Sequence, residues 1–505
     1  MYPKLLSAAI LFILSVNLHG QLLNHYWVNN FNSLSSLLGG AVVAGEGDNT
    51  AIYYNPATIT QMQKGSNFSV AANLFTWNFY ILDNALGHGI GLSTDNFLVQ
   101  PQFISYTYTP PNKYGISLAA SALTRVKEKM EKTYTKASYM DVIKRYPGLE
   151  KYNTYYSYRN NYTDAWVGLA AAQQVNDNFS YGVTMFASFS TLIYNNTWSA
   201  TAYNPNDTIG FINFNLAEGA YSESIKFTDY RLIFKIGFAY QIENWKFGFN
   251  ITTTSLKVFS SGKTATRMAK QSNIAYEGNL LPDYIIFDGQ NKSDLKTNYK
   301  MPWSFAFGFI YDMPNEGRRI YLTAEYFTGI KQYKMVEAQI RDDITTPPIY
   351  EILELTGEAD WLSFGYGARP VFNVAIGYSL TIKKDLIFLN AFRTDFSAVN
   401  KDQLLEDFTL NYITTSNFNI YHYSAGVKFS LGKNRFIAGA DLGFGYKLNQ
   451  EQITNFSDPV EFIPDGGFGR ALQGPLENKM DSYYIGINFY IAATLNFSKN
   501  GTEVE

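Results

Sequence analysis

The sequence contains no cysteine among its 505 residues, and it has few charged side chains. The missing cysteine excludes disulfides, thiolate metal sites, a cysteine nucleophile and a lipid-anchored N-terminal cysteine. Charged residues make up only 16% of the chain, whereas a typical soluble domain has about 25%. The net charge of −3 gives no reason to expect nucleic acid as a partner.

Long hydrophobic runs are also missing. Beyond the N-terminus no stretch of about 18 apolar residues occurs, so no transmembrane helix is expected. The first residues combine Lys4 with the apolar run Leu5–Val16, and Leu18, His19 and Gly20 precede Gln21. This pattern predicts a signal peptide over 1–20 that is cleaved on export. The apolar run is too short to span a bilayer as a helix.

Groupings of catalytic or metal-binding residues are absent as well. Outside the predicted signal peptide the histidines are His25, His88 and His422, and none stands in a serine–histidine or metal-ligand pattern. The glycine-rich run at 87–91 follows no strand–helix pattern, so it predicts a flexible outer loop rather than a phosphate cradle. We therefore expect no enzyme, no catalytic residue, no cofactor and no metal site.

Aromatic residues, in contrast, are abundant at 17%, with 39 Tyr and 38 Phe. In the run 303–311 every odd position is aromatic and the even positions are mostly small. Similar alternation runs along 229–241, 419–431 and 483–497. Successive side chains of a strand point to opposite faces. Each run therefore predicts a strand with one apolar face and one face of small, polar or charged residues.

Fourteen ranges are predicted to be strands. They are 67–80, 97–109, 114–126, 164–173, 179–193, 229–241, 245–258, 302–312, 319–328, 371–382, 385–396, 419–431, 435–446 and 483–497. Short connections at 110–113, 174–178, 242–244, 313–318, 383–384 and 432–434 alternate with long ones at 81–96, 127–163, 194–228, 259–301, 329–370, 397–418 and 447–482. This alternation is typical of outer-membrane barrels, which have short periplasmic turns and long outer loops.

The expected fold is therefore all-β, a transmembrane antiparallel β-barrel of about fourteen strands over 67–497 with a periplasmic tail over 498–505. A β-sandwich also alternates, but predicted strands of about 10–14 residues suit tilted membrane strands better. The loop 127–163 is expected to contain a short helix around 138–145. Its many tyrosines are expected to pack over the mouth of the barrel, or to collect an apolar ligand.

Residues 21–66 precede the first predicted strand and are too polar and glycine-rich to be a membrane strand themselves. They contain Gly39, Gly40, Gly45 and Gly47 and then the tripeptide Asn55, Pro56, Ala57. A fourteen-strand barrel is too wide for its wall side chains to fill, so this segment is predicted to be a hatch in the lumen. Glycines permit tight turns, and Pro56 and Asn55 favour a fixed turn. The alternative is that the tripeptide is only the turn into the first strand.

The order of these elements resembles the N-terminal hatch of the FadL family, which transports hydrophobic compounds across the outer membrane. The resemblance is to a member of the Bacteroidetes type. The resemblance covers motifs over about 37–66, and beyond them it rests on architecture. It implies passive uptake of hydrophobic or amphipathic compounds such as long-chain fatty acids. It also implies a sideways exit near a kinked third strand, here 114–126. Outer-membrane lipids and the barrel-assembly machinery are then the expected surroundings and partner.

Charges on the predicted lumen face include Arg125, Arg231, Lys235, Arg393 and Lys428. They are expected to form wall networks or bind the hatch, or to hold the head group of an amphipathic anion. An alternative function is a structural or adaptor subunit of an outer-membrane secretion or surface-assembly complex, by analogy with FadL-like barrels serving type IX secretion in Bacteroidetes. A general aqueous porin is a third alternative, which the hatch disfavours.

Overall fold

The structure is a computed structural model of the chain. It describes residues 25–27, 31–112, 114–146, 148–209, 212–291, 295–314, 316–338, 362–383, 385–399, 411–412, 418–431, 434–464 and 470–494. The predicted signal peptide and the predicted tail over 498–505 lie outside the described residues, as do 21–24 and 28–30 of the predicted hatch.

Helical structure is confined, within these ranges, to the stretch before the first strand. It comprises α2 (Ser33–Leu37), α3 (Ala51–Tyr54) and the 3-10 helix η1 (Pro56–Gln61). No described helix has the length and hydropathy that crossing a bilayer requires. Nearly all other elements are strands, which confirms the prediction of an all-β fold.

One large sheet contains sixteen of the described strands. In chain order they are β1 (Gly65–Asp83), β2 (Leu92–Thr109), β3 (Ile116–Met140), β4 (Glu150–Gln174), β5 (Phe179–Ile209), β6 (Ile212–Ile242), β7 (Trp245–Thr252), β8 (Leu256–Ser272), β11 (Tyr284–Asn291), β13 (Ser304–Met313), β14 (Arg318–Phe327), β17 (Val371–Lys383), β18 (Leu386–Asp395), β20 (Asn419–Leu431), β21 (Asn434–Gln450) and β24 (Met480–Thr494). The remaining described strands are β9 (Ala275–Tyr276), β10 (Asn279–Leu280), β12 (Leu295–Thr297), β15 (Ile330–Ala338), β16 (Phe364–Ala368), β19 (Asn411–Tyr412), β22 (Val460–Ile463) and β23 (Arg470–Gln473).

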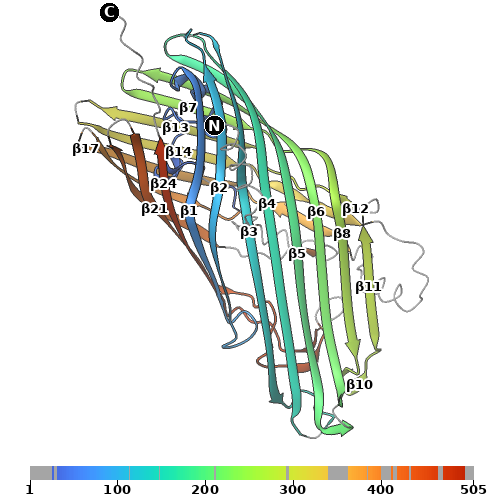
Figure 1. Ribbon diagram of the computed structural model, residues 1–505. Helices are drawn as coiled ribbons and strands as arrows, with labels where there is room; N and C mark the ends of the chain where they lie inside the picture. The colour runs from blue at the N-terminus through green and yellow to red at the C-terminus, as the bar shows by residue number, and fades with distance from the viewer. Residues whose placement is uncertain are drawn as a thin grey trace, which may run out of the picture.

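Neighbouring strands of the large sheet are antiparallel, and the order in which they pair leads from β6 along the wall and back to β6. From β6 it runs through β5, β4, β3, β2 and β1 to β24, and then through β21, β20, β18, β17, β14 and β13 to β7. β6 pairs with β7 along Lys235–Ile242 and with β8 along Glu218–Leu232. Strands β8 and β11 therefore extend the sheet beyond β6. Figure 1 shows the tilted strands wrapping together, with short turns at the upper end and the hairpins of β3 to β6 at the lower end.

Each predicted strand range overlaps a strand of the large sheet, but the outer connections differ from the prediction. The ranges 127–163 and 194–228, expected to be long loops, are instead continuous hairpins of β3 with β4 and of β5 with β6. The helix predicted around 138–145 is wrong, because Ser138–Met140 end strand β3. Backbone pairing continues there with tyrosine, threonine and asparagine in the alternating positions, and these residues suit a strand as well as a loop.

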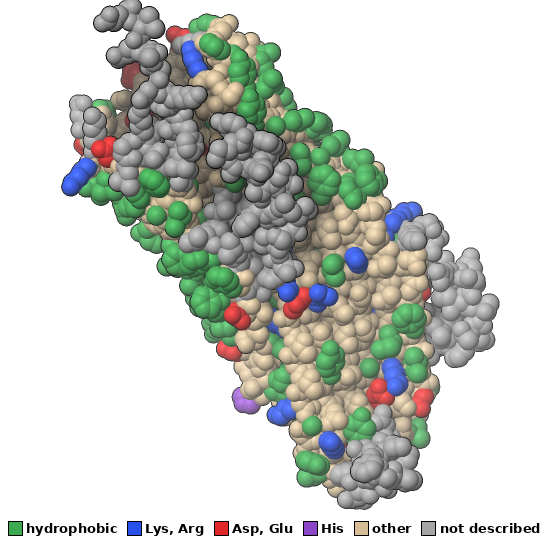
Figure 2. Space-filling view, in the orientation of Figure 1, with side chains coloured by type: hydrophobic (Ala, Val, Ile, Leu, Met, Phe, Trp, Pro, Cys, Tyr) green, Lys and Arg blue, Asp and Glu red, His purple; other side chains and the backbone are tan. Residues whose placement is uncertain are grey.

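Large hydrophobic side chains lie on the outer face of the wall. Phe307 is 45% exposed, whereas the neighbouring Ala306 is buried on the inner face. Phe249, Ile376 and Phe392 are other exposed examples. On the face seen in Figure 2, hydrophobic side chains gather over the upper part, and scattered charges lie over the lower part. An apolar outer band of this kind suits a lipid environment.

Candidate functional site

The N-terminal segment, defined here as residues 31–62, lies against the inner face of the large sheet. Leu37, Leu38 and Ile52 are completely buried. Helix α2 contacts β18, β20, β21 and β24, and the 3-10 helix η1 contacts β3, β4, β5 and β6. The segment thus touches strands from several sides of the wall and fills space that the wall side chains leave open.

The four glycines predicted for the hatch adopt left-handed backbone conformations. Their φ angles are +62° at Gly39, +76° at Gly40, +99° at Gly45 and +71° at Gly47. Glycine adopts such angles without strain because it has no Cβ atom. A Cβ on Gly45 would also lie 2.8 Å from the side chain of Thr58. These glycines let the chain reverse direction repeatedly between α2 and α3.

Asn55 connects the segment both to itself and to the wall. Its Oδ1 accepts a hydrogen bond from the Ala57 amide at 3.1 Å and so caps η1. Its Nδ2 donates to the carbonyl oxygens of Val43, at 2.8 Å, and of Phe238, at 2.9 Å. Pro56 follows at the first position of η1, where a backbone N–H has no helical partner anyway. A side-chain amide supplies both the acceptor and the two donors that this buried position uses.

Glycines on the inner face of the wall make room for the segment. Gly182 in β5 and Gly237 in β6 stand against Asn55 and Pro56, and a Cβ on Gly182 would lie 2.7 Å from the Pro56 carbonyl carbon. Other wall glycines that stand against the segment are Gly248, Gly308, Gly377, Gly426 and Gly439. Sequence reasoning missed this set. The signal was available, because each glycine lies on the small-residue face of an alternating run.

Polar wall side chains also bind the backbone of the segment. Four of them donate to its carbonyl oxygens: Ser180 to Ala57 at 3.1 Å, Thr184 to Ile52 at 2.9 Å, Asn250 to Tyr54 at 2.5 Å and Ser424 to Leu37 at 3.1 Å. Buried carbonyl groups need such partners, because an unpaired one is costly. The inner face of the wall is therefore complementary to the segment in shape and in hydrogen bonding.

Two of the predicted lumen charges bind the described residues before the segment. Arg125 of β3 donates through Nη2 to the Tyr26 carbonyl at 2.9 Å. Arg393 of β18 donates through Nη1 to the Trp27 carbonyl at 3.0 Å. The Trp27 indole in turn donates to Glu325 at 2.7 Å. Strands β3, β14 and β18 thus all bind this short stretch.

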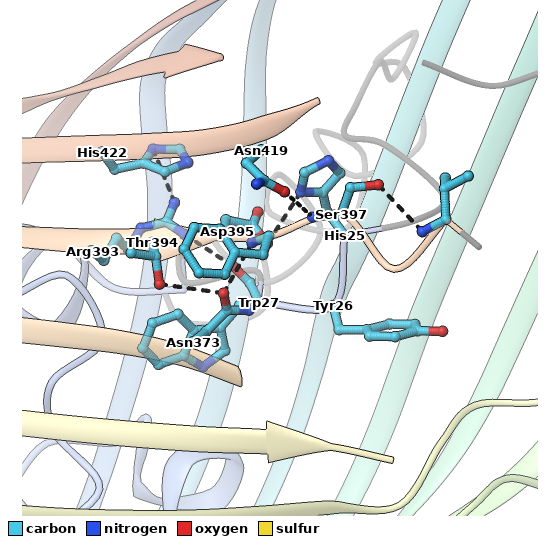
Figure 3. A network of polar contacts seen from close by, with 12 residues as sticks. His25, Tyr26, Trp27, Asn373, Arg393, Thr394, Asp395, Ser397, Asn419 and His422 are labelled. Carbon is cyan, nitrogen blue, oxygen red and sulfur yellow. Dashed lines mark hydrogen bonds and ion pairs between the residues drawn. The ribbon is translucent and has the colours of Figure 1, made fainter. Parts of the chain in front are cut away.

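Figure 3 shows that Arg393 also belongs to a buried polar network. Its Nη2 lies 3.2 Å from His422 Nδ1, and the same ring nitrogen lies 3.1 Å from Asp441 Oδ2. His25 Nδ1 lies 3.2 Å from Asp395 Oδ1. Sequence analysis assigned no partner to His422. The structure pairs these buried charges with one another, which offsets the penalty of burying them.

The other predicted lumen charges lie apart from this network. Arg231 Nη2 donates to Asp164 Oδ1 at 3.0 Å within the wall. Lys235 Nζ lies 4.8 Å from the centre of the Tyr53 ring, so it contacts the segment. Lys428 lines a cavity at the short-turn end of the wall. The five predicted charges are therefore not gathered into one head-group site.

Two of the cavities lined by described residues border the interior. The short-turn cavity has a volume of about 350 Å³, and Glu46, Arg318, Arg319 and Lys428 are among its lining residues. The outer cavity lies between the hairpins β1–β2 and β3–β4 and the end of β21, and it is smaller, at about 40 Å³. Its lining is mostly apolar. The first cavity thus offers charge, and the second offers a hydrophobic surface.

Glu46 links the segment to the wall beside the short-turn cavity. Its Oε1 accepts hydrogen bonds from Arg319 Nη1 at 3.1 Å and from the Tyr321 hydroxyl at 3.2 Å. Its Oε2 has no hydrogen-bond partner among the described residues. Burial raises the pKa of Glu46 above its usual range, and the charges of Arg319 and two nearby lysines oppose that rise. Burial thus makes ionisation of Glu46 more costly than that of a carboxyl group in water.

Comparisons with known proteins show similarity in structure but not in sequence. No model of a known protein family matches the chain, and no curated protein matches it in sequence. A FadL homologue of Pseudomonas aeruginosa superposes with a TM-score of 0.55 and 12% identity, over 95% of this chain and 100% of that one. The Pseudomonas putida toluene transporter TodX superposes with a TM-score of 0.53 and 11% identity, over 94% and 100%. The fold of this chain is therefore that of a FadL-like β-barrel.

Proposed function

We propose that this protein is an outer-membrane channel for the passive uptake of hydrophobic or amphipathic compounds, including long-chain fatty acids. The observation that carries the proposal is a buried N-terminal segment inside a wall whose outer face is apolar. A plugged barrel suits selective passage better than free diffusion of solutes. The structural likeness to a toluene transporter supports the same class of cargo.

In this proposal the membrane part is a closed ring of fourteen strands, with β8 and β11 outside the ring. The pairing of β7 with both β6 and β13 supports this closure. Residues 21–66 then act as the hatch, after cleavage of the signal peptide 1–20. Barrel-assembly machinery would insert the ring, with both chain ends on the periplasmic side.

A sideways exit beside β3 is part of the proposal. Among the described residues, β2 and β3 pair only between Phe103–Tyr108 and Leu118–Leu123, although both strands continue further out. The pairing of β3 with β4 also shifts register between Thr124 and Val126. A bulge with one unpaired side gives a local break in the wall. Such a break supports passage of an apolar compound into the membrane.

Uptake measurements test the proposal. Cells that lack the gene should accumulate radiolabelled laurate or toluene more slowly at limiting concentrations, and a plasmid copy should restore the rate. Asn55→Ala should lower uptake because it removes three hydrogen bonds from the segment. A matched change on a short outer strand, Asn279→Ala, should have no effect. Equal uptake with and without the gene would refute the function.

A second candidate function is that of an adaptor barrel in a secretion or surface-assembly complex. The observation that favours it is the length of β5 and β6, which have 31 residues each. A membrane strand needs only about 9–11 residues, so these hairpins extend well beyond a bilayer and offer a surface to other proteins. Mild purification from the native membrane tests this candidate. A stoichiometric protein partner would favour the adaptor, and a bound lipid would favour the channel.

A further inference from the structure

Aromatic side chains mark where the apolar band of the outer face ends on β5, β6 and β8. The outward positions of β5 from Tyr181 to Phe189 are aromatic or aliphatic, over a length that matches the about 9–11 residues a membrane strand needs. The ring of Phe189 lies 5.6 Å from that of Tyr230 in β6, and Tyr230 stacks on Phe259 of β8 at 4.0 Å. Aromatic residues gather at membrane–water interfaces. In the proposed outer membrane these three rings, the aromatic border, therefore mark the outer surface.

Basic side chains follow the aromatic border on the same outer face. Lys226 lies on β6, four residues further out than Tyr230, and it is exposed. Lys129 of β3 lies in the same row of the sheet, with β4 and β5 between them. Arg159 of β4 belongs to the next row outward, and its side chain is 52% exposed. At about 3.3 Å per residue these positions are close enough to the border for long basic side chains to reach lipid head groups.

Further out, the same face of these strands is neutral. The next two rows consist of Thr133, Ser157, Thr197 and Ser222, and of Thr135, Tyr155, Ser199 and Ala220. Lys151, near the outer end of β4, lies beyond both rows. On the adjoining strands β1 and β2 the exposed residues near the outer end include Asp83 and Asp95. A surface that serves solubility alone spreads its charges, so cations close beyond the border and on one side of the wall indicate a partner at that height.

Glu131 of β3 holds two of the three cations in place. Its Oε1 accepts hydrogen bonds from Arg159 Nε at 2.8 Å and from the Asn161 amide at 3.2 Å, and its Oε2 lies 3.2 Å from Lys129 Nζ. Among the described residues, the Arg159 Nη groups and Lys226 Nζ have no hydrogen-bond or ion-pair partner. One carboxylate against three cations leaves a charge of +2. A guanidinium held through Nε presents both Nη groups to an anion such as a phosphate.

We propose that Lys129, Arg159 and Lys226 form a site for the phosphate groups of the glycolipid in the outer leaflet of the outer membrane. The Arg159 Nη groups donate to one phosphate, and the two lysines attract it and a second phosphate as point charges. Strands β4 and β6 are about 10 Å apart, a spacing that suits a head group with more than one phosphate. The acyl chains then lie along the apolar band. The inference rests on the proposed placement of the wall in the outer membrane, and it does not depend on what passes through the interior.

A lipid explains the position of the cations better than an acidic protein partner does. The cations lie at the height of the head groups, where anionic lipid meets them without any further structure. The two rows further out, which only a soluble partner could contact, carry uncharged side chains. An acidic protein docked on the hairpins would be matched by cations in those rows.

Native mass spectrometry of the purified full-length protein in a nonionic detergent tests the site. The probes are lipid A with two phosphates, phosphatidylethanolamine, whose net charge is zero, and inorganic phosphate. Arg159→Gln and Lys226→Gln should each weaken lipid A binding about fivefold, the effect of one basic residue near an anionic membrane surface, and together about 25-fold. Lys151→Gln is the matched control and should bind like the parent, because Lys151 lies on the same face of β4 beyond the neutral rows.

A second variant and a second readout separate charge from folding. Arg159→Lys keeps the charge and should bind lipid A more tightly than Arg159→Gln. Lipid A should raise the unfolding temperature of the parent more than that of the double variant, and salt should weaken its binding. Inorganic phosphate should not displace the lipid at equal concentration, because it has no acyl chains. Lipid A binding that is unchanged in the double variant, or that falls equally in Lys151→Gln, would overturn the proposal.

The remaining outcomes identify another partner or concern the channel alone. Loss of phosphatidylethanolamine binding by the same factor as lipid A, or displacement of lipid A by an equal concentration of inorganic phosphate, would overturn the lipid site. A double variant that keeps lipid A but loses a co-purified protein would assign the surface to that protein instead. Charge-dependent lipid A binding without any gene-dependent uptake would refute the channel function and leave the lipid site standing.

Discussion

The short-turn half and the outer half of the interior are filled in different ways. In the short-turn half, Gly182, Gly237 and Gly308 leave the wall without side chains where the N-terminal segment packs. In the outer half the same inner face carries large groups. Tyr152, Tyr156, Tyr162 and Tyr194 are all almost completely buried there. One half is thus filled by an inserted segment, and the other by the side chains of its own strands.

This difference shows how one alternating pattern serves two purposes. Interiors must be close-packed, so a wide barrel needs either large wall side chains or an insert. Glycine on the inner face is stable only where another part of the chain occupies the space. The missing side chains at Gly182, Gly237 and Gly308 therefore mark places where the segment packs against the wall.

Removing the segment should have the largest effect. Deletion of Leu37–Ala57 removes no wall strand, so the sheet should still assemble. It leaves an inner face of glycine and small polar residues that water can fill, so single-channel conductance in a planar bilayer should rise from a low parental value to that of an open pore. A deletion at the tip of the β3–β4 hairpin, residues 141–149, should leave conductance at the parental value. An assembled deletion protein that conducts no better than the parent would show that the segment is not a plug.

A change on the outer face should have the next largest effect. Phe307→Arg places a charge on an exposed apolar position and should destabilise the assembled protein by about 2–4 kcal/mol if that position is near the middle of the membrane. Ala306→Ser is the control, because it lies on the inner face opposite Asn250. Heat-modifiable gel mobility after refolding measures both. Equal tolerance of the two changes would mean that the outer face does not contact lipid.

The sequence predicted the wall better than the interior. Strict alternation in runs such as 303–311 identified strands, because a strand of this kind needs one apolar face whether that face contacts lipid or a protein core. The β3–β4 hairpin was predicted as a loop, and five of the six residues in 127–132 are lysine or glutamate. One face of β4 carries Tyr152, Tyr156, Tyr158 and Tyr162. The two-residue alternation of a strand was therefore present, but the polar residues between these tyrosines obscured it.

The interior was only partly predictable. The tripeptide from Asn55 to Ala57 indicated a fixed turn, and the structure adds that Asn55 also binds Phe238 of the wall. No local pattern could reveal that Arg125 binds Tyr26, since the two residues are far apart in sequence. The cluster of lumen charges also does not form one site. Pairing of buried charges depends on which strands become neighbours, and a single sequence does not display that.

Crowding one wall glycine should have an intermediate effect. A side chain on Gly237 would collide with Asn55 and Pro56, so Gly237→Val should displace the segment and destabilise the protein by about 1–3 kcal/mol, as overpacking usually does. Brief openings should appear in bilayer recordings. Gly289→Ala is the control, because a Cβ there meets only side-chain atoms at 3.3 Å or more. If Gly237→Val has normal stability and shows no openings in bilayer recordings, the proposed complementarity of wall and segment is wrong.

The smallest effect is expected at Glu46, where the segment meets the charged short-turn cavity. The pKa of Glu46 is raised by burial, so its contribution to stability is complete below the ordinary carboxyl pKa of about 4.3 and is lost as pH rises through the raised value. Glu46→Gln keeps an acceptor for Tyr321 and cannot ionise. Its thermal stability should therefore match the parent at pH 4 and exceed it at pH 8, by at most about 1 kcal/mol, the scale of one hydrogen bond. Glu316→Gln, which changes an exposed partner of Arg318, should follow the parent at every pH. Parallel profiles for Glu46→Gln and the parent would show that Glu46 ionises without cost, and that the segment is held by its glycine and amide contacts alone.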